Sequence, residues 1–231
     1  MTEKLYNDGT YLANNQSWHA NDSQWKANKI IAMLEKNHIN PKSVSEVGCG
    51  AGEILISLSQ HFKDTEFFKG YDISQQAYEI CSQKENDRIK FELNDITQLE
   101  VYFDLIMAID VFEHIEDYIG FLKSFKEKGL YKIFHIPLDL SAQTVLRSKP
   151  IIYSRKKMGH LHYFNKDTAL ATLKDLGYEI LDYKFTKWSL ERPNNNILSK
   201  FASIPRWFLH QINEELAANL LGGCSLLVLA K

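Results

Sequence analysis

The chain has 231 residues, of which 45% are hydrophobic and 24% charged, a balance typical of a folded globular domain. This composition excludes a disordered or fibrous chain, because enough apolar surface is present to form a core. The 27 Lys and Arg residues and the 29 Asp and Glu residues leave a formal net charge of −2. A chain without a strong positive charge attracts nucleic acid only weakly, so we expect no nucleic-acid partner.

The cysteines and the N-terminus indicate the compartment. Cys49, Cys81 and Cys224 are odd in number and widely spaced, and they form no C-x-x-C pair, which argues against a disulfide framework or a zinc knuckle. The first residues lack the basic start and apolar run of a signal peptide. The longest nearly apolar stretch, 220–230, is shorter than the roughly 20 residues that a spanning helix needs. We therefore expect a cytoplasmic protein without a transmembrane segment.

Hydrophobic periodicity predicts strands that alternate with helices along the chain. A first helix is predicted over 24–36, and the simpler interpretation of the segment before it makes Asp22 and Ser23 the cap of this helix. The elements that follow are strands over 43–48, 67–72, 88–93, 103–109 and 131–136, and helices over 51–62, 75–84 and 117–128. The remaining elements are an irregular stretch over 139–159, a helix over 166–176, and strands over 178–185 and 225–230.

This alternation predicts an α/β fold, a doubly wound and mostly parallel sheet with helices on both faces. In such sheets, ligands bind beyond the carboxyl ends of the strands, where the strand order reverses. Residues that directly follow a strand are therefore the first candidates for a functional site.

The strongest motif is the run Glu46–Gly52, which leaves a predicted strand and opens a helix. Its glycines let the backbone turn tightly and approach a ligand, and the helix behind them supplies free N–H groups. A dinucleotide fingerprint needs Gly or Ala at position 53, where this chain has Glu53. The G-x-G-x-G spacing behind an acidic residue instead suits a cofactor with a cationic amino group. The simpler alternative is a tight turn that binds no ligand.

Three further motifs follow the next strands in order. Asp72 ends the second strand, Asn94-Asp95-Ile96 follows the third, and Asp110–Ile115 follows the fourth. With the glycine run, they make residues 43–187 resemble the class I S-adenosylmethionine-dependent methyltransferases of the small-molecule type. That resemblance implies a Rossmann-like sheet whose last strand is antiparallel, with S-adenosyl-L-methionine as cofactor and S-adenosyl-L-homocysteine as product.

The resemblance also implies which residues hold this cofactor. The glycine motif, with Glu46, Gly48, Cys49, Gly50 and Gly52, would wrap the methionine part. The ribose and adenine would be held by a second group, consisting of Asp72, Ile73, Asn94, Asp95 and Ile96. Asp110 and Val111 would meet the methionine amino group. Two simpler alternatives stay open, since Asp72 suits a helix cap and Asp95 a polar turn.

Histidines are the candidates for the catalytic base. His114 follows the fourth strand and suits either proton transfer from the acceptor or a packing role. His160 and His162 form an H-x-H pair that fits the lining of an acceptor pocket. A metal site on this pair lacks a third ligand of obvious spacing, so we expect no metal. His135 lies within a strand and is expected to be a hydrogen-bonded core residue.

The resemblance also gives the domain organisation and the acceptor. We expect one methyltransferase domain over 1–231, with segment 1–40 as an N-terminal flap and helix, and 188–222 as an inserted cap. Trp18 and His19 in the flap would face the acceptor. These additions are similar to those of methyltransferases associated with polysaccharide synthesis. The segment 197–212 is basic and amphipathic, and a lid explains it better than contact with a membrane surface.

The predicted function is methyl transfer to an oxygen or nitrogen atom of a small acceptor, such as a sugar or glycolipid precursor. Two alternatives remain open: a catalytically silent module that only binds the cofactor, and a nucleic-acid methyltransferase. The second would usually carry a D/N-P-P-Y/F-type motif after the fourth strand, which Asp110–Glu113 does not match. A nicotinamide dehydrogenase is a more distant possibility.

Overall fold

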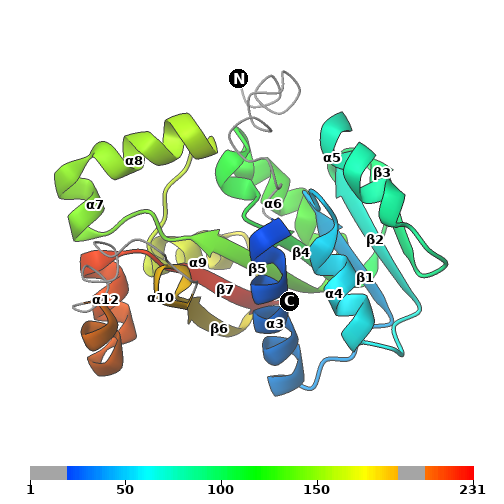
Figure 1. Cartoon of the computed structure of the whole chain (residues 1–231), viewed down its shortest axis with the longest axis horizontal. Coiled ribbons are helices and arrows are strands. Elements are labelled where there is room, and N and C mark those ends of the chain that lie inside the picture. The colour runs from blue at the N-terminus through cyan, green and yellow to red at the C-terminus, as the bar shows by residue number, and fades with distance from the viewer. Residues whose placement is uncertain (1–19, 192–205) are drawn as a thin grey trace.

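A computed structural model describes residues 20–191 and 206–231 (Figure 1). Within these ranges the chain forms one sheet of seven strands, in the order β3-β2-β1-β4-β5-β7-β6. The strands are β1 (Ser43–Val47), β2 (Phe67–Asp72), β3 (Ile89–Leu93), β4 (Phe103–Ile109), β5 (Gly129–Pro137), β6 (Ile180–Thr186) and β7 (Ser225–Ala230). Trp18, His19 and the part of the expected cap over 192–205 lie outside the described residues.

The sheet confirms the predicted fold class. Strands β1 to β5 pair in parallel, whereas β7 runs antiparallel to both β5 and β6. The strand order reverses between β1 and β4, which are neighbours in the sheet. This reversal is the position at which doubly wound sheets bind their ligands.

Helices cover both faces of the sheet (Figure 1). The longer ones are α3 (Ala20–Lys36), α4 (Glu53–His61), α5 (Gln75–Cys81), α6 (Tyr118–Lys126), α9 (Lys166–Asp175) and α12 (Glu214–Leu221). Short helices are α7 (Ala142–Arg147), α8 (Lys149–Tyr153), α10 (Trp188–Glu191), a helix over 206–212, and the single turns η1 (Ser82–Lys84), η2 (Ile96–Gln98), η3 (Phe112–His114) and η4 (Ser154–Met158).

Two hydrophobic cores hold these layers together, one on each face of the sheet. Alternate residues of β4 point to opposite sides. Leu105 and Met107 belong to the core shared with α3 and α4, and Ile106 and Ala108 to the core shared with α6 and α9. Such burial on both faces is typical of a central strand in a doubly wound sheet and anchors the loops that follow it.

Two local predictions are wrong. The stretch 139–159, expected to be irregular, forms α7, α8 and the π-helical turn η4. Ser141 and Thr144 make a reciprocal capping box that starts α7, and Pro150 occupies the first turn of α8. The described part of the first helix already includes Ala20, so Asp22 lies inside the helix and does not precede it as a cap.

Candidate functional site

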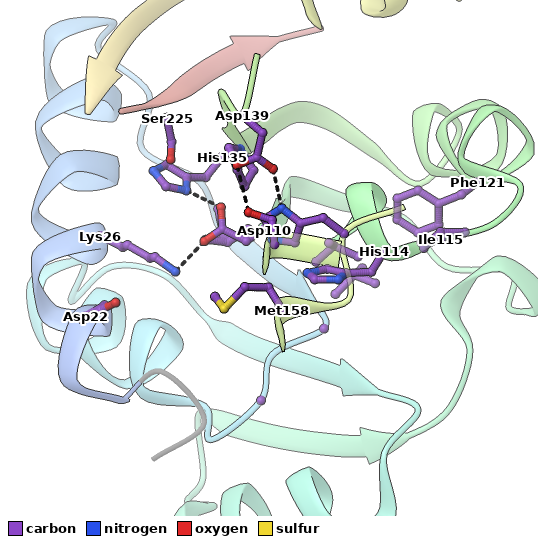
Figure 2. A pocket seen from close by; sticks show the side chains of 18 of the residues that line it. Asp22, Lys26, Asp110, His114, Ile115, Phe121, His135, Asp139, Met158 and Ser225 are labelled. Atoms are coloured by element: carbon purple, nitrogen blue, oxygen red, sulfur yellow. Dashed lines mark hydrogen bonds and ion pairs between the residues drawn. The ribbon is translucent and has the colours of Figure 1, made fainter. Parts of the chain in front are cut away.

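A cavity of about 1390 Å³ opens at the carboxyl ends of the parallel strands, where the strand order reverses (Figure 2). The loops that follow β1 to β5 all contribute to its wall. Pockets for one small ligand usually measure about 300–1,000 Å³. This cavity is therefore large enough for two ligands side by side.

The glycine loop between β1 and α4 is held in a conformation that requires glycine. Gly48, Gly50 and Gly52 have φ angles of 64°, 52° and 78°, in the left-handed region. A Cβ atom on Gly48 would lie only 2.9 Å from the Val111 side chain. The bare backbone of Gly48 and Gly50 thus reaches the cavity wall in front of the first N–H groups of α4, whereas Gly52 lies against Phe91.

Asp72 links the end of β2 to this loop. Its Oδ2 atom accepts a hydrogen bond from the Gly50 backbone N–H at 2.9 Å, and its Oδ1 atom accepts one from Ser74 at 2.8 Å. Burial raises the pKa of Asp72, although these backbone donors oppose the shift. Ser74 caps α5, so the capping role considered for Asp72 belongs to its neighbour. Asp72 and the half-exposed Ile73 both line the cavity.

The loop after β3 lines the next part of the wall with Asn94, Asp95 and Ile96. The Asp95 carboxylate accepts a hydrogen bond from Thr97 N–H at 2.9 Å and so caps η2. The backbone N–H of Asn94 donates to the Asp72 carbonyl at 3.0 Å. The turn role considered for Asp95 is present, and its place in the cavity wall leaves the cofactor role compatible with it.

Glu46 is a buried acid at the end of β1. It is 2% exposed, it lines the cavity, and its Oε2 atom has no hydrogen-bond partner among the described residues. Burial raises the pKa of Glu46 well above its usual range, although the charge of Lys26 opposes this shift. Because an unsatisfied buried carboxylate is costly, this position suits a ligand that brings a positive charge. The amino group of S-adenosylmethionine fits that requirement.

Cys49 has no accessible thiolate. Its side chain is buried, and both a hydrogen bond with Cys81 and burial raise the pKa of its thiol. The backbone N–H of Cys49 donates to the Tyr71 carbonyl at 3.1 Å, which fixes the loop against β2. Cys49 is therefore a small packing residue between glycines and is not a nucleophile.

A charged network crosses the cavity floor at Asp110 (Figure 2). The Asp110 carboxylate pairs with Lys26 Nζ at 2.6 Å and with His135 Nδ1 at 2.6 Å, and His135 Nε2 reaches Thr186 Oγ1 at 2.8 Å. Burial opposes ionisation of Asp110, but the charges of His135 and Lys26 hold its pKa well below the usual range. Asp110 and Val111 both line the cavity.

Sequence reasoning missed Lys26 and assigned His135 only to the core. Lys26 lies on the same side of α3 as Ser23 and Ile30, both of them buried. A lysine at such spacing within an apolar helix face was the available signal for a buried partner. His135 is indeed buried and hydrogen-bonded, but it also lines the cavity.

The structure brings together two of the three candidate histidines. His114 and His160 both line the cavity, with ring centroids 4.9 Å apart. His160 Nδ1 lies 2.5 Å from the carboxylate of Asp139, a residue that sequence reasoning missed. His162 is absent from the cavity wall in the described part of the chain: its Nε2 atom contacts the Ile115 carbonyl at 2.8 Å, and its ring packs on Tyr118.

Helices that the sequence did not predict also line the cavity. Arg147, Tyr153 and Met158, from α7, α8 and η4, contribute to its wall together with Arg206. Arg206 Nη2 donates to the Leu221 carbonyl at 3.0 Å, which ties the helix over 206–212 to α12. None of the helices in residues 20–191 and 206–231 is both long enough and apolar enough to cross a membrane.

Comparison with known sequences identifies a family to which the chain belongs and an enzyme to which it is distantly similar. A family model described as "Methyltransferase domain" matches residues 17–183, more than half of the chain. Pavine N-methyltransferase from Thalictrum flavum subsp. glaucum is 24% identical over 178 residues, which cover 68% of this chain and 49% of that enzyme. The chain therefore spans about half the length of this curated relative.

Solved structures share the fold. Magnesium protoporphyrin IX methyltransferase from Synechocystis PCC 6803 with bound SAH superposes with a TM-score of 0.61 at 18% identity, covering 90% of this chain and 82% of that one. A [4+2]-cyclase, SpnF, superposes with a TM-score of 0.56 at 14% identity, covering 81% of this chain and 73% of that one. At such identities the likeness concerns the fold, and the cyclase illustrates that this fold carries more than one chemistry.

Proposed function

This chain belongs to the class I S-adenosylmethionine-dependent methyltransferases, and we propose that it transfers a methyl group to an oxygen or nitrogen atom of a small acceptor. The observation that carries the proposal is one cavity in which the glycine loop, Asp72 and the unsatisfied Glu46 lie together. These groups match, in order, the parts of the cofactor: backbone N–H groups for its carboxylate, a carboxylate for its ribose, and a buried acid for its amino group.

The donor would lie along the carboxyl ends of the strands. Glu46 and the loop of Gly48, Gly50 and Gly52 hold the methionine part, and Asp72 accepts hydrogen bonds from the ribose hydroxyls. Ile73 and the segment 94–96 enclose the adenine ring. The bound cofactor supplies a methyl group on a positively charged sulfur. Because that methyl group is already activated, the protein contributes mainly alignment and the exclusion of water.

The acceptor would occupy the rest of the cavity, with its reacting atom against His114 and His160. Arg147 and Arg206 also line the cavity. Two guanidinium groups favour an acceptor that carries a phosphate or carboxylate, as sugar and glycolipid precursors do. They disfavour a cationic amine, even though the curated relative is named for N-methylation. The flap over 1–40, the cap over 188–222 and a cytoplasmic location remain part of this proposal.

Transfer of a labelled methyl group tests the proposal. The purified protein would be incubated with S-adenosylmethionine carrying a labelled methyl group and a panel of nucleotide sugars, lipid-linked sugar phosphates, small amines and nucleic acids. We expect label in one anionic small acceptor. Donor binding without transfer to any member of the panel would favour the silent module, and label in nucleic acid would contradict the small-molecule assignment.

A further inference from the structure

We propose that Glu113, His114 and His160 form a divalent-metal site in the wall of the cavity, beside the proposed acceptor position. Each side chain offers one ligand atom, these atoms lie within 4.8 Å of one another, and all three residues are buried. The sequence offered the pair of His160 and His162 without a third ligand. In the folded chain, η3 supplies the two further ligands, Glu113 and His114, and His162 is not part of the site.

Glu113 is the observation that calls for a cation. It is 1% exposed, and neither of its carboxylate oxygens has a hydrogen-bond partner among the described residues. Its closest ionisable contact is His114 Nε2, 3.8 Å from Oε1. A buried carboxyl group without hydrogen bonds is costly whether it is ionised or protonated. A bound cation would satisfy both oxygens and remove this cost.

His160 is oriented as a metal ligand. Its Nδ1 atom is engaged by Asp139 Oδ2 at 2.5 Å, which leaves Nε2 as the nitrogen available for coordination. A carboxylate that accepts the second N–H of a histidine is the usual partner of metal-binding imidazoles, because it fixes the ring and raises its basicity. Asp139 therefore acts as a positioning residue in this proposal.

Backbone contacts hold the three ligands together. η3 directly follows β4 and carries both Glu113 and His114. The backbone N–H groups of Leu161 and His162 donate to the Glu113 carbonyl at 2.8 Å and 3.1 Å, which pins the segment carrying His160 onto η3. Metal bonds of about 2.1 Å would require the ligand atoms to close by roughly 1 Å, a movement within the reach of side-chain rotation.

Two imidazole nitrogens and one carboxylate oxygen suit Zn²⁺, Co²⁺, Fe²⁺ or Mn²⁺, and they leave at least one position open. His114 and His160 line the cavity, so the open position faces the acceptor. This catalytic use rests on the proposed function. An acceptor hydroxyl bound to the cation would release its proton to water, and its oxygen would attack the methyl carbon. The carbon–sulfur bond then breaks with its electron pair left on sulfur.

The test is metal binding by the full chain, after removal of metal with a chelator. Zn²⁺ would be titrated by calorimetry, and Co²⁺ would be followed by its visible absorption. We expect one equivalent of metal per chain, with affinity lowered roughly 100-fold in Glu113→Gln and His160→Ala, and about 10- to 100-fold in Asp139→Asn. His61→Gln, on an exposed histidine paired with Glu35, is the matched control and should bind as the parent does.

Glu113→Gln separates a ligand from a structural acid, because Gln keeps the shape and the neutral charge of a protonated carboxyl group. Unchanged metal affinity in this variant, or a loss shared equally by His61→Gln, would overturn the site. If methyl transfer continues unchanged after the metal is removed, the catalytic use is overturned while the binding site stands. If no acceptor is methylated, the proposed function fails, yet the titrations still decide the site.

Discussion

Asp110 carries an unusual combination of backbone conformation and charge. Its φ of 56° lies in the left-handed region that residues other than glycine seldom adopt. The ion pair of its carboxylate with Lys26 and its hydrogen bond with His135 oppose this strain. The side chain thus fixes the turn that also directs η3 toward the cavity.

Replacing Asp110 with Asn tests this role while keeping a residue type that tolerates the left-handed region. We expect the free energy of unfolding to fall by about 2 kcal/mol, because the largely buried Lys26 would lose the charge that it pairs with. Urea unfolding measures the change. Asp64→Asn, on an exposed aspartate, is the control and should stay within about 0.5 kcal/mol of the parent. An equally small effect of Asp110→Asn would show that the ion pair adds nothing.

Glu46 predicts a pH dependence of cofactor binding. Burial raises the pKa of Glu46 in the free protein, whereas in the proposed donor site the amino group of the cofactor would favour the ionised carboxylate. Binding should therefore release a proton, and affinity should rise with pH until Glu46 is already ionised without ligand. Calorimetry in buffers of different ionisation enthalpy detects the proton. Glu46→Gln should lose this pH dependence and bind roughly 10- to 100-fold more weakly; an unaltered pH profile would assign the proton to another group.

Asp72 gives the most direct test of the donor site. Replacing it with Asn keeps the size of the side chain and removes its negative charge. In the proposed donor site, this carboxylate would accept hydrogen bonds from the ribose hydroxyls. We expect about 10- to 100-fold weaker binding of S-adenosylhomocysteine. At a concentration 100 times its dissociation constant, this ligand should stabilise the parent by about 2.7 kcal/mol, visible as a rise in Tm. A similar Tm rise in the variant at the same ligand concentration would contradict the assignment.

At the scale of single elements, the side chain of Glu191 connects α3 to the segment that follows β6. Glu191 in α10 accepts a hydrogen bond from Trp25 Nε1 at 2.8 Å and pairs with Lys29 Nζ at 2.5 Å. α3 also carries Lys26, so this contact indirectly supports the cavity floor. The expected flap helix and the start of the expected cap are thereby linked.

Glu191→Gln should loosen that link. We expect a loss of about 1 kcal/mol, because the groups are partly exposed, and roughly fivefold faster hydrogen exchange of amides in the first turns of α3. Hydrogen-exchange mass spectrometry measures this rate. Glu35→Gln, also in α3, removes an exposed pair with His61 of α4 and is the matched control. Equal exchange in the parent and Glu191→Gln would mean that packing alone holds α3.

The elements differ in how well the sequence predicts them. β2 and β4 match their predicted bounds because each is a short run that packs into the sheet. The helices α7 and α8 were missed because they bury no residue, so they carry no periodic apolar stripe. Leu146 in α7 is 85% exposed, and the capping Ser141 is followed by Thr144 where a more recognisable box has Glu or Gln.

At the scale of the whole molecule, the sequence predicts those site residues whose position follows from the strand directly before them. The glycine loop and Asp72 directly follow strands, so the topology alone places them at one edge of the sheet. Asp110 and Lys26, however, are 84 positions apart and meet only because α3 packs on the sheet face whose core includes residues of β4. The pairing of His160 with Asp139 likewise depends on helices that left no pattern in the sequence.

Strand β7 lies between β5 and β6, although it follows both of them in the chain. On the ribosome, β5 therefore emerges with an open edge, and β6 has no neighbour to pair with until β7 has been synthesised. Unpaired strand edges can pair with strands of other chains. The nascent chain is therefore prone to aggregation from the synthesis of β5 until that of β7. We expect chaperone dependence during translation to end only when β7 inserts between β5 and β6.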